Sequence, residues 1–96
     1  MTPRPTLLFY CQHAMGMGHL VRSLALADEL SRSFRVVLLN GGELPSCLSL
    51  PRTVEILNLP PLRFADGQLI SCDDRYSVVQ AQDARVNQIL GLFRQL

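Results

Sequence analysis

The chain has 96 residues, 48% of them hydrophobic and 18% charged, with a formal net charge of +1 at pH 7. This length suits one domain, and the composition is that of a chain that folds around a core. The small net charge and the lack of a basic run argue against a nucleic-acid partner. All nine cationic side chains are arginine. This excludes a Schiff-base lysine and the Gly-Lys-Ser/Thr phosphate loop, because both need lysine.

The three cysteines, Cys11, Cys47 and Cys72, are odd in number and widely spaced, without a C-x-x-C pair. This spacing favours reduced thiols over a disulfide framework or a zinc site. No apolar run approaches the roughly 18 residues that cross a membrane. The short apolar block after residue 6 is too brief for a secretory signal. We therefore expect a cytoplasmic protein, for which a peripheral contact with a membrane surface stays open.

Three strands and one helix are predicted in the first sixty residues. Residues 7–11 form an unbroken apolar run of strand length. Leucine and alanine then recur at helical spacing and predict an amphipathic helix over 19–32. The apolar segments 35–40 and 54–59 predict two further strands, stopped by a Gly-Gly and a Pro-Pro pair.

The last third of the chain divides into a loop and a helix. Residues 60–77 are rich in proline, glycine, serine and aspartate and predict an irregular polar loop. Its adjacent Asp73 and Asp74 are more typical of solvated side chains than of a metal site. From about residue 77, apolar residues share one face of a second amphipathic helix: Val79, Val86, Ile89, Leu90, Phe93 and Leu96.

Strands that alternate with a helix predict the α/β class, as a Rossmann-like parallel sheet with flanking helices and right-handed crossovers. In a doubly wound sheet the first strand lies centrally and later strands extend its other side. Residues 1–96 supply only one half of such a sheet. Strand 7–11 would then be an apolar edge, which folded proteins avoid and which can pair with a second copy. We expect an incomplete domain of a longer protein.

The segment from Cys11 to Arg22, C-Q-H-A-M-G-M-G-H-L-V-R, joins the first strand to the first helix. Gly16 and Gly18 allow the backbone to approach a ligand closely, and the helix start offers N–H groups to an anion. The dinucleotide-binding pattern is not met, because its third glycine position holds Val21 and the acid after the second strand is Asn40. A plain strand-to-helix turn stays open as the alternative.

Four segments in register carry a resemblance to a known family: Phe9-Tyr10-Cys11-Gln12-His13, Gly16-x-Gly18-His19-x-x-Arg22, Asn40-Gly41-Gly42 and Leu57-x-Leu59-Pro60-Pro61-Leu62. On these segments the chain resembles the N-terminal domain of GT-B glycosyltransferases, in particular the glycosyltransferase family 28-like group. That group includes the N-acetylglucosaminyltransferase of peptidoglycan lipid synthesis and predicted bacterial glycosyltransferases. The resemblance implies the acceptor-side half of a GT-B enzyme. Nothing in residues 1–96 matches the second domain, which holds the nucleotide sugar.

The resemblance further implies sugar transfer from a nucleotide-sugar donor to the hydroxyl of a sugar or lipid-linked acceptor, with no bound metal and no cofactor. His19 would be the general base, because an acceptor hydroxyl must lose its proton to attack the anomeric carbon. In similar enzymes an acid farther along the chain orients this histidine. The substrate-binding residues expected with it are His13, Gly16, Gly18, Arg22, Asn40, Gly41 and Gly42. Packing, turn or solvated roles stay open for each of them.

Two other functions stay open. A GT-B-type nucleotide-sugar epimerase would share the scaffold and depend on acids and histidines outside this sequence. A non-catalytic module would bind an anionic ligand through the loop from Gly16 to His19. If the chain is a fragment of a glycosyltransferase or of an epimerase, the 96 residues alone are expected to be inactive.

Overall fold

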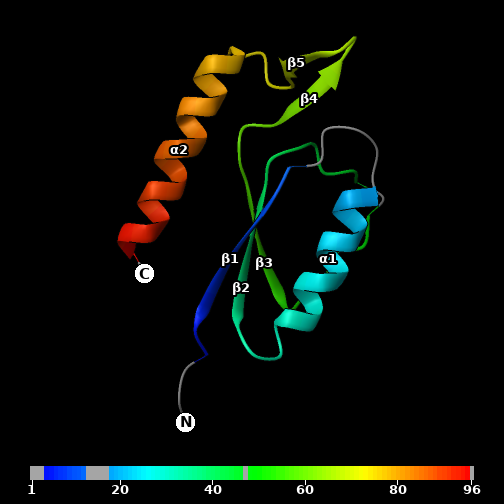
Figure 1. The fold of residues 1–96 in the computed structure, drawn as a ribbon, viewed down its shortest axis with the longest axis vertical. Coiled ribbons are helices and arrows are strands. Elements are labelled where there is room, and N and C mark those ends of the chain that lie inside the picture. The colour runs from blue at the N-terminus through cyan, green and yellow to red at the C-terminus, as the bar shows by residue number, and fades with distance from the viewer. Residues whose placement is uncertain (1–3, 13–17, 47, 96) are drawn as a thin grey trace.

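The computed structural model describes residues 4–12, 18–46 and 48–95. Its elements, labelled in Figure 1, are β1 (Thr6–Cys11), α1 (Gly18–Leu30), β2 (Arg35–Asn40), β3 (Val54–Asn58), β4 (Leu62–Ala65), β5 (Gln68–Ser71) and α2 (Val78–Gln95). The first three strands form a parallel sheet in the order β1-β2-β3, and β4 pairs with β5 in an antiparallel hairpin. The α/β class and the parallel sheet with flanking helices are confirmed.

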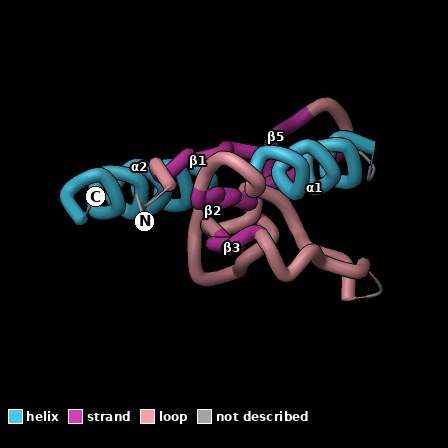
Figure 2. Tube along the Cα trace, turned by 90° about the horizontal axis from the view of Figure 1, so that it is seen from below, coloured by secondary structure: helices cyan, strands magenta, loops and turns pink. Residues whose placement is uncertain are grey.

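The two helices cover opposite faces of the sheet (Figure 2). Alternate residues of β2 divide between these faces, as the pleat of a strand requires. Val36 and Leu38 pack in the core cluster that holds the buried residues of α1. Val37 and Leu39 pack in a second cluster with Ile89 of α2. The unbroken apolar run of β2 follows from this arrangement, because both faces of a strand between two helices are buried.

The predicted boundaries hold to within one residue for the three strands and for the start of α2, whereas α1 ends earlier than predicted. Strand 35–40 is observed as predicted, and the other two strands differ by one residue at one end. Helix α1 ends at Leu30, two residues before the predicted end, and residues 31–33 form a turn. Helix α2 starts with a capping box. The hydroxyl of Ser77 accepts from the Gln80 N–H at 3.2 Å, and the Gln80 side chain accepts from the Ser77 N–H at 2.9 Å.

The prediction of an irregular loop over residues 60–77 is wrong, because strands β4 and β5 lie within it. Asp66 and Gly67 form the turn between them with φ values of 50° and 74°. Two positive φ values are typical of the tight hairpin turns that Asp-Gly favours. The prediction missed the two four-residue strands on either side of Asp-Gly because it depended on the polar composition of the segment.

Only part of the apolar face of α2 packs on the sheet. Ala81 and Arg85 are its buried residues, with Ile89 and Leu92 partly buried beside them. Four large apolar residues of the helix are exposed: Val79, Val86, Leu90 and Phe93. As expected, β1 lies at one edge of the sheet; within the described ranges it pairs only with β2. No helix in the described part of the chain is both long enough and apolar enough to cross a membrane.

Candidate functional site

The carboxyl ends of the three parallel strands meet at one edge of the sheet. Gln12 follows β1, Gly41 and Gly42 follow β2, and Pro60 lies two residues beyond β3. The backbone ties these ends together, because the Gly41 N–H donates to Cys11 at 2.9 Å and the Leu62 N–H donates to Gly41 at 3.0 Å. In open α/β sheets this edge is where ligands bind.

A buried arginine from α2 holds the three strand ends. Arg85 is 6% exposed. Its Nε and Nη2 donate to the Pro60 carbonyl at 2.9 and 2.8 Å, and Nη2 also donates to the Gly41 carbonyl. Its Nη1 donates to the Tyr10 hydroxyl at 2.8 Å and to the Gln12 amide oxygen. We call these five residues the Arg85 cluster.

The buried cation of the Arg85 cluster is stabilised by hydrogen bonds to neutral oxygen atoms and not by a carboxylate. Among the described residues, no acidic side chain forms an ion pair with Arg85. Burying a charge is costly unless its hydrogen-bonding groups are satisfied. All five N–H groups of this guanidinium can be accommodated by the contacts above. The chain therefore keeps a fixed positive charge close to the carboxyl edge of the sheet.

Gly41 is the point of closest approach within the Arg85 cluster. A Cβ at this position would lie 2.5 Å from the Gln12 amide oxygen and 3.0 Å from Arg85 Nη1. Gln12 is itself fixed, because its Nε2 donates to the Leu62 carbonyl at 3.2 Å and its oxygen accepts from Tyr10 at 3.3 Å. Only glycine leaves room for this packing.

A cavity of about 600 Å³ opens beside the Arg85 cluster. Apolar side chains of the hairpin and of α2 form most of its wall, and side chains of the cluster and of Gln82 supply the polar groups. The lining residues are Tyr10, Gln12, Leu62, Phe64, Leu69, Gln82, Arg85, Val86 and Ile89. The cavity thus combines a largely apolar wall with a few polar groups, as small-molecule sites do.

The residues predicted in the glycine-rich segment lie at the start of α1 where they are described. Gly18, His19 and Arg22 are all exposed on the first turns of this helix. Within the described residues, no side-chain hydrogen bond or ion pair engages His19 or Arg22. His13 and Gly16 lie outside the described residues. The imidazole of His19 is therefore accessible to solvent and to a ligand.

The predicted segment from Asn40 to Gly42 is buried and makes contacts within the chain. The Asn40 amide donates to the Gly42 carbonyl at 2.9 Å and to the Asn58 side chain at 3.0 Å. Its oxygen accepts from the Gly42 N–H at 3.4 Å. These contacts link the ends of β2 and β3, which gives the segment a structural role whether or not it also meets a ligand.

The segment after β5 carries an ion pair between Asp73 and Arg75. Hydrogen bonds from the Arg75 guanidinium, followed by one from its backbone N–H, lower the pKa of Asp73 to about 2. Burial raises the pKa of the Cys72 thiol, which disfavours the reactive thiolate. Within the described ranges, no group of three or more histidine, cysteine or acidic residues is placed to hold a metal ion.

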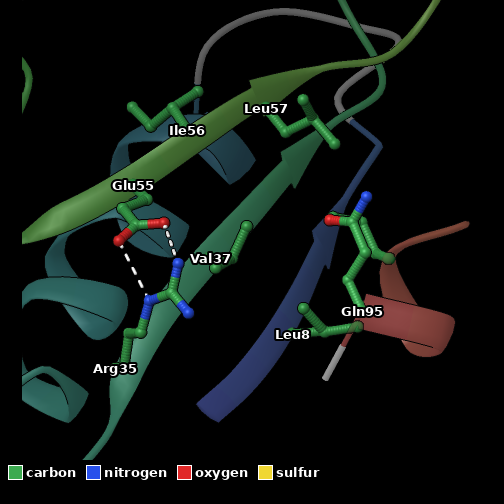
Figure 3. A pocket seen from close by; sticks show the side chains of 8 residues that line it. Leu8, Arg35, Val37, Glu55, Ile56, Leu57 and Gln95 are labelled. Carbon is green, nitrogen blue, oxygen red and sulfur yellow. Dashed lines mark hydrogen bonds and ion pairs between the residues drawn. The ribbon is translucent and has the colours of Figure 1, made fainter. Parts of the chain in front are cut away.

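A second cavity, of about 260 Å³, lies on the α2 side of the sheet (Figure 3). Leu8, Val37 and Leu57 line it, together with Gln95 of α2. Beside them Arg35 and Glu55 form a two-point ion pair with distances of 3.0 and 2.9 Å. Arg35 is the first residue of β2, so the ion pair lies toward the amino ends of the strands. Of the predicted site residues that the structure describes, none lines this cavity.

Comparisons of the chain with protein-family models, with curated proteins and with solved structures found no match. The assignment of function therefore depends on the residues and their geometry. Sequence reasoning placed Tyr10 and Gln12 in a motif without giving either a role, and passed over Arg85. One signal for Arg85 was available, since it lies four residues after Ala81 and four before Ile89 on the packed face of α2. A charged residue in such a position is buried only with partners.

Proposed function

We propose that the chain is the acceptor-side part of a GT-B glycosyltransferase, which transfers a sugar from a nucleotide-sugar donor to an acceptor hydroxyl. The observation that carries the proposal is the exposed His19 on the first turn of α1, where that helix follows the carboxyl end of β1. The resemblance of the surrounding segments to that family supports it. The free thiols Cys11 and Cys72 agree with a cytoplasmic location, where we place the enzyme.

In this proposal His19 accepts the proton of the acceptor hydroxyl as its oxygen attacks the anomeric carbon of the donor. The bond from that carbon to the nucleotide phosphate breaks, and the nucleotide leaves with the electron pair. An imidazole suits this step because it is a base of moderate strength at physiological pH. Arg22, one turn farther along α1, is positioned to approach a phosphate group.

The Arg85 cluster fixes the strand ends next to the proposed site. It joins β1, β2 and β3 at the edge where the acceptor would lie, so the loops that leave these strands start from fixed points. The cavity beside the cluster offers an apolar wall for the part of an acceptor that carries no sugar. Binding sites supported by a rigid second layer hold their substrates in better geometry.

The test starts with the coding DNA, which is read in frame beyond codon 96 for a domain with a nucleotide-sugar site. The product of that frame is then assayed with labelled nucleotide sugars, as wild type, His19→Ala and His19→Gln. Loss of a general base lowers kcat by about 100- to 10,000-fold. Arg32→Ala, in the exposed turn that follows α1, is the matched control and should keep full activity.

Three results would count against the proposal. Sugar transfer within tenfold of wild type in both His19 variants would exclude the histidine as the base. Interconversion of the nucleotide sugar without transfer to any acceptor would identify an epimerase instead. Tight binding of an anion by the 96-residue chain, with no transferase activity from the longer frame, would favour the non-catalytic module.

A further inference from the structure

A third cavity, of about 250 Å³, lies beyond β3 at the carboxyl edge of the sheet. The chain from Asn58, the last residue of β3, to Pro61 forms part of its wall. The other lining residues are Asp73, Arg75 and Tyr76 from the segment after β5 and Gln88 from α2. We call this space the polar cavity, because most of the side chains that these last elements contribute are polar.

The polar cavity lies on the side of the domain opposite to the free edge of β1. The strand order is β1-β2-β3, and none of its lining residues within the described ranges belongs to β1 or β2. Later strands of a doubly wound sheet join beyond β1. On α2, Gln88 lies about 160° around the helix from Val86, which lines the larger cavity beside Tyr10. The two cavities therefore open on different flanks of α2.

The backbone wall of the polar cavity is fixed by long-range hydrogen bonds. Pro60 is buried, and its carbonyl accepts from Arg85 Nε at 2.9 Å. The Pro61 carbonyl accepts from the Cys72 N–H at 2.9 Å, which ties the segment after β5 to the segment after β3. A wall that is held in place before a ligand arrives lowers the entropic cost of binding.

Several polar groups of the polar cavity keep unused hydrogen-bonding capacity. The Asn58 amide oxygen accepts from Asn40 at 3.0 Å, which leaves the Asn58 NH₂ group able to donate. Among the residues that the structure describes, no hydrogen bond engages the Gln88 amide or the Tyr76 hydroxyl. Amide and hydroxyl groups both donate and accept, so they match a ligand that carries several hydroxyls.

Charge and size narrow the class of ligand. Asp73 and Arg75 pair at 2.7 Å, and the Arg75 guanidinium lies 5.8 Å from the centre of the Tyr76 ring. The opposite charges of this pair cancel, which favours a neutral polar ligand over an ion. A volume of about 250 Å³ is below the roughly 300–1,000 Å³ of sites for drug-sized ligands, so it suits a single ring and not a nucleotide.

We propose, building on the transferase function above, that the polar cavity holds a neutral sugar ring of the acceptor. Such a ring presents adjacent hydroxyls, each of which can donate and accept. Pro60 and Pro61 line the polar cavity, whereas the next residue, Leu62, lines the apolar cavity beside the Arg85 cluster. An acceptor with a sugar ring and an apolar group thus has a matching cavity on each side of this segment.

The test is amide NMR of the isotopically labelled chain, titrated to about 50 mM with methyl glycosides of neutral hexoses, because a single ring is expected to bind in the millimolar range. The side-chain amide signals of Asn58 and Gln88 should shift and saturate. Gln88→Ala and Arg75→Met should each weaken binding about 3- to 10-fold, which is the effect of one net hydrogen bond. Asn87→Ala, at the exposed neighbour of Gln88 in α2, is the matched control and should bind as the wild type does.

A second measurement separates the sugar site from the proposed base. In the transferase assay, Gln88→Ala should raise the KM for the acceptor about 3- to 10-fold and leave kcat unchanged, whereas His19→Ala lowers kcat. Saturable sugar shifts without any transfer would uphold the sugar site and refute the transferase. Transfer with an unchanged KM in Gln88→Ala would overturn the sugar site and uphold the transferase. A wild type without saturable shifts at Asn58, or one in which inorganic phosphate binds there more tightly than the glycosides, would also overturn the sugar site.

Discussion

Replacement of Arg85 by methionine tests whether the buried guanidinium holds the three strand ends together. Methionine retains much of the apolar stem but donates no hydrogen bond. The Pro60 carbonyl would lose both of its contacts with Arg85, at 2.9 and 2.8 Å. The Gly41 carbonyl would keep its hydrogen bond from Leu62 and lose the one from Arg85. Tyr10 and Gln12 can still bond to each other.

The expected cost follows from these contacts. A buried polar group left without a partner costs about 1–3 kcal/mol, and a hydrogen bond to a charged group contributes about 1.5–3 kcal/mol. Removal of the buried charge recovers part of this, because the cation no longer has to be kept out of water. We expect Arg85→Met to lower the free energy of unfolding by about 3 kcal/mol, a large fraction of the stability of a small domain.

Urea denaturation followed by circular dichroism measures this loss, with the slope of the transition checked for two-state behaviour. Arg94→Met is the matched control, because Arg94 lies in the same helix and is exposed; it should change the unfolding free energy by less than about 0.5 kcal/mol. An unfolding free energy for Arg85→Met within about 1 kcal/mol of the wild-type value would refute the reasoning. It would mean that the cluster contributes little net stability.

Two further predictions concern local packing and titration. Gly41→Ala should destabilise the fold by about 1–3 kcal/mol by displacing Gln12, whereas Gly91→Ala, where a Cβ meets open space, should stabilise α2 by up to about 1 kcal/mol; thermal unfolding compares them, and equal shifts would contradict the packing argument. The pKa of Asp73, which is lowered to about 2, should rise in Arg75→Met but stay below its usual 3.8, because the backbone N–H of residue 75 still donates to the carboxylate. The contacts of Asp73 with Arg75 stabilise the segment above about pH 4, and this stabilisation is lost as the pH falls toward 2. The carboxyl NMR shift of Asp73 measures its pKa in the wild type and in the variant. An unchanged pKa in the variant would exclude the Arg75 side chain as the cause of the lowered pKa.

The sheet and both helices could be predicted because their signals are local. The run from Val36 to Leu39 is apolar at every position, as a strand buried on both faces must be. The hairpin was missed for a compositional reason, since its short strands lie among prolines and aspartates. The Asp66-Gly67 pair was the local sequence signal for a hairpin turn, and the prediction did not use it.

The Arg85 cluster could not be predicted in the same way, because its contacts join residues that are far apart in the sequence. Arg85 lies 75 residues from Tyr10 and 44 from Gly41. A charged residue in a helical pattern predicts an exposed side chain unless its partners are known. The exposure of Val79, Val86, Leu90 and Phe93 could not be predicted for a related reason, since periodicity identifies an apolar face but not what covers it.

The candidate site divides into accessible residues and supporting residues, and this division sharpens the proposed function. Of the predicted residues that the structure describes, Gly18, His19 and Arg22 are exposed on α1, whereas the segment from Asn40 to Gly42 is buried in contacts that join β2 to β3. A substitution at His19 should therefore change chemistry without changing stability. A substitution at Gly41 should do the reverse and affect a ligand only through the position of the strand ends. Measuring both properties in both variants separates a catalytic role from a structural one.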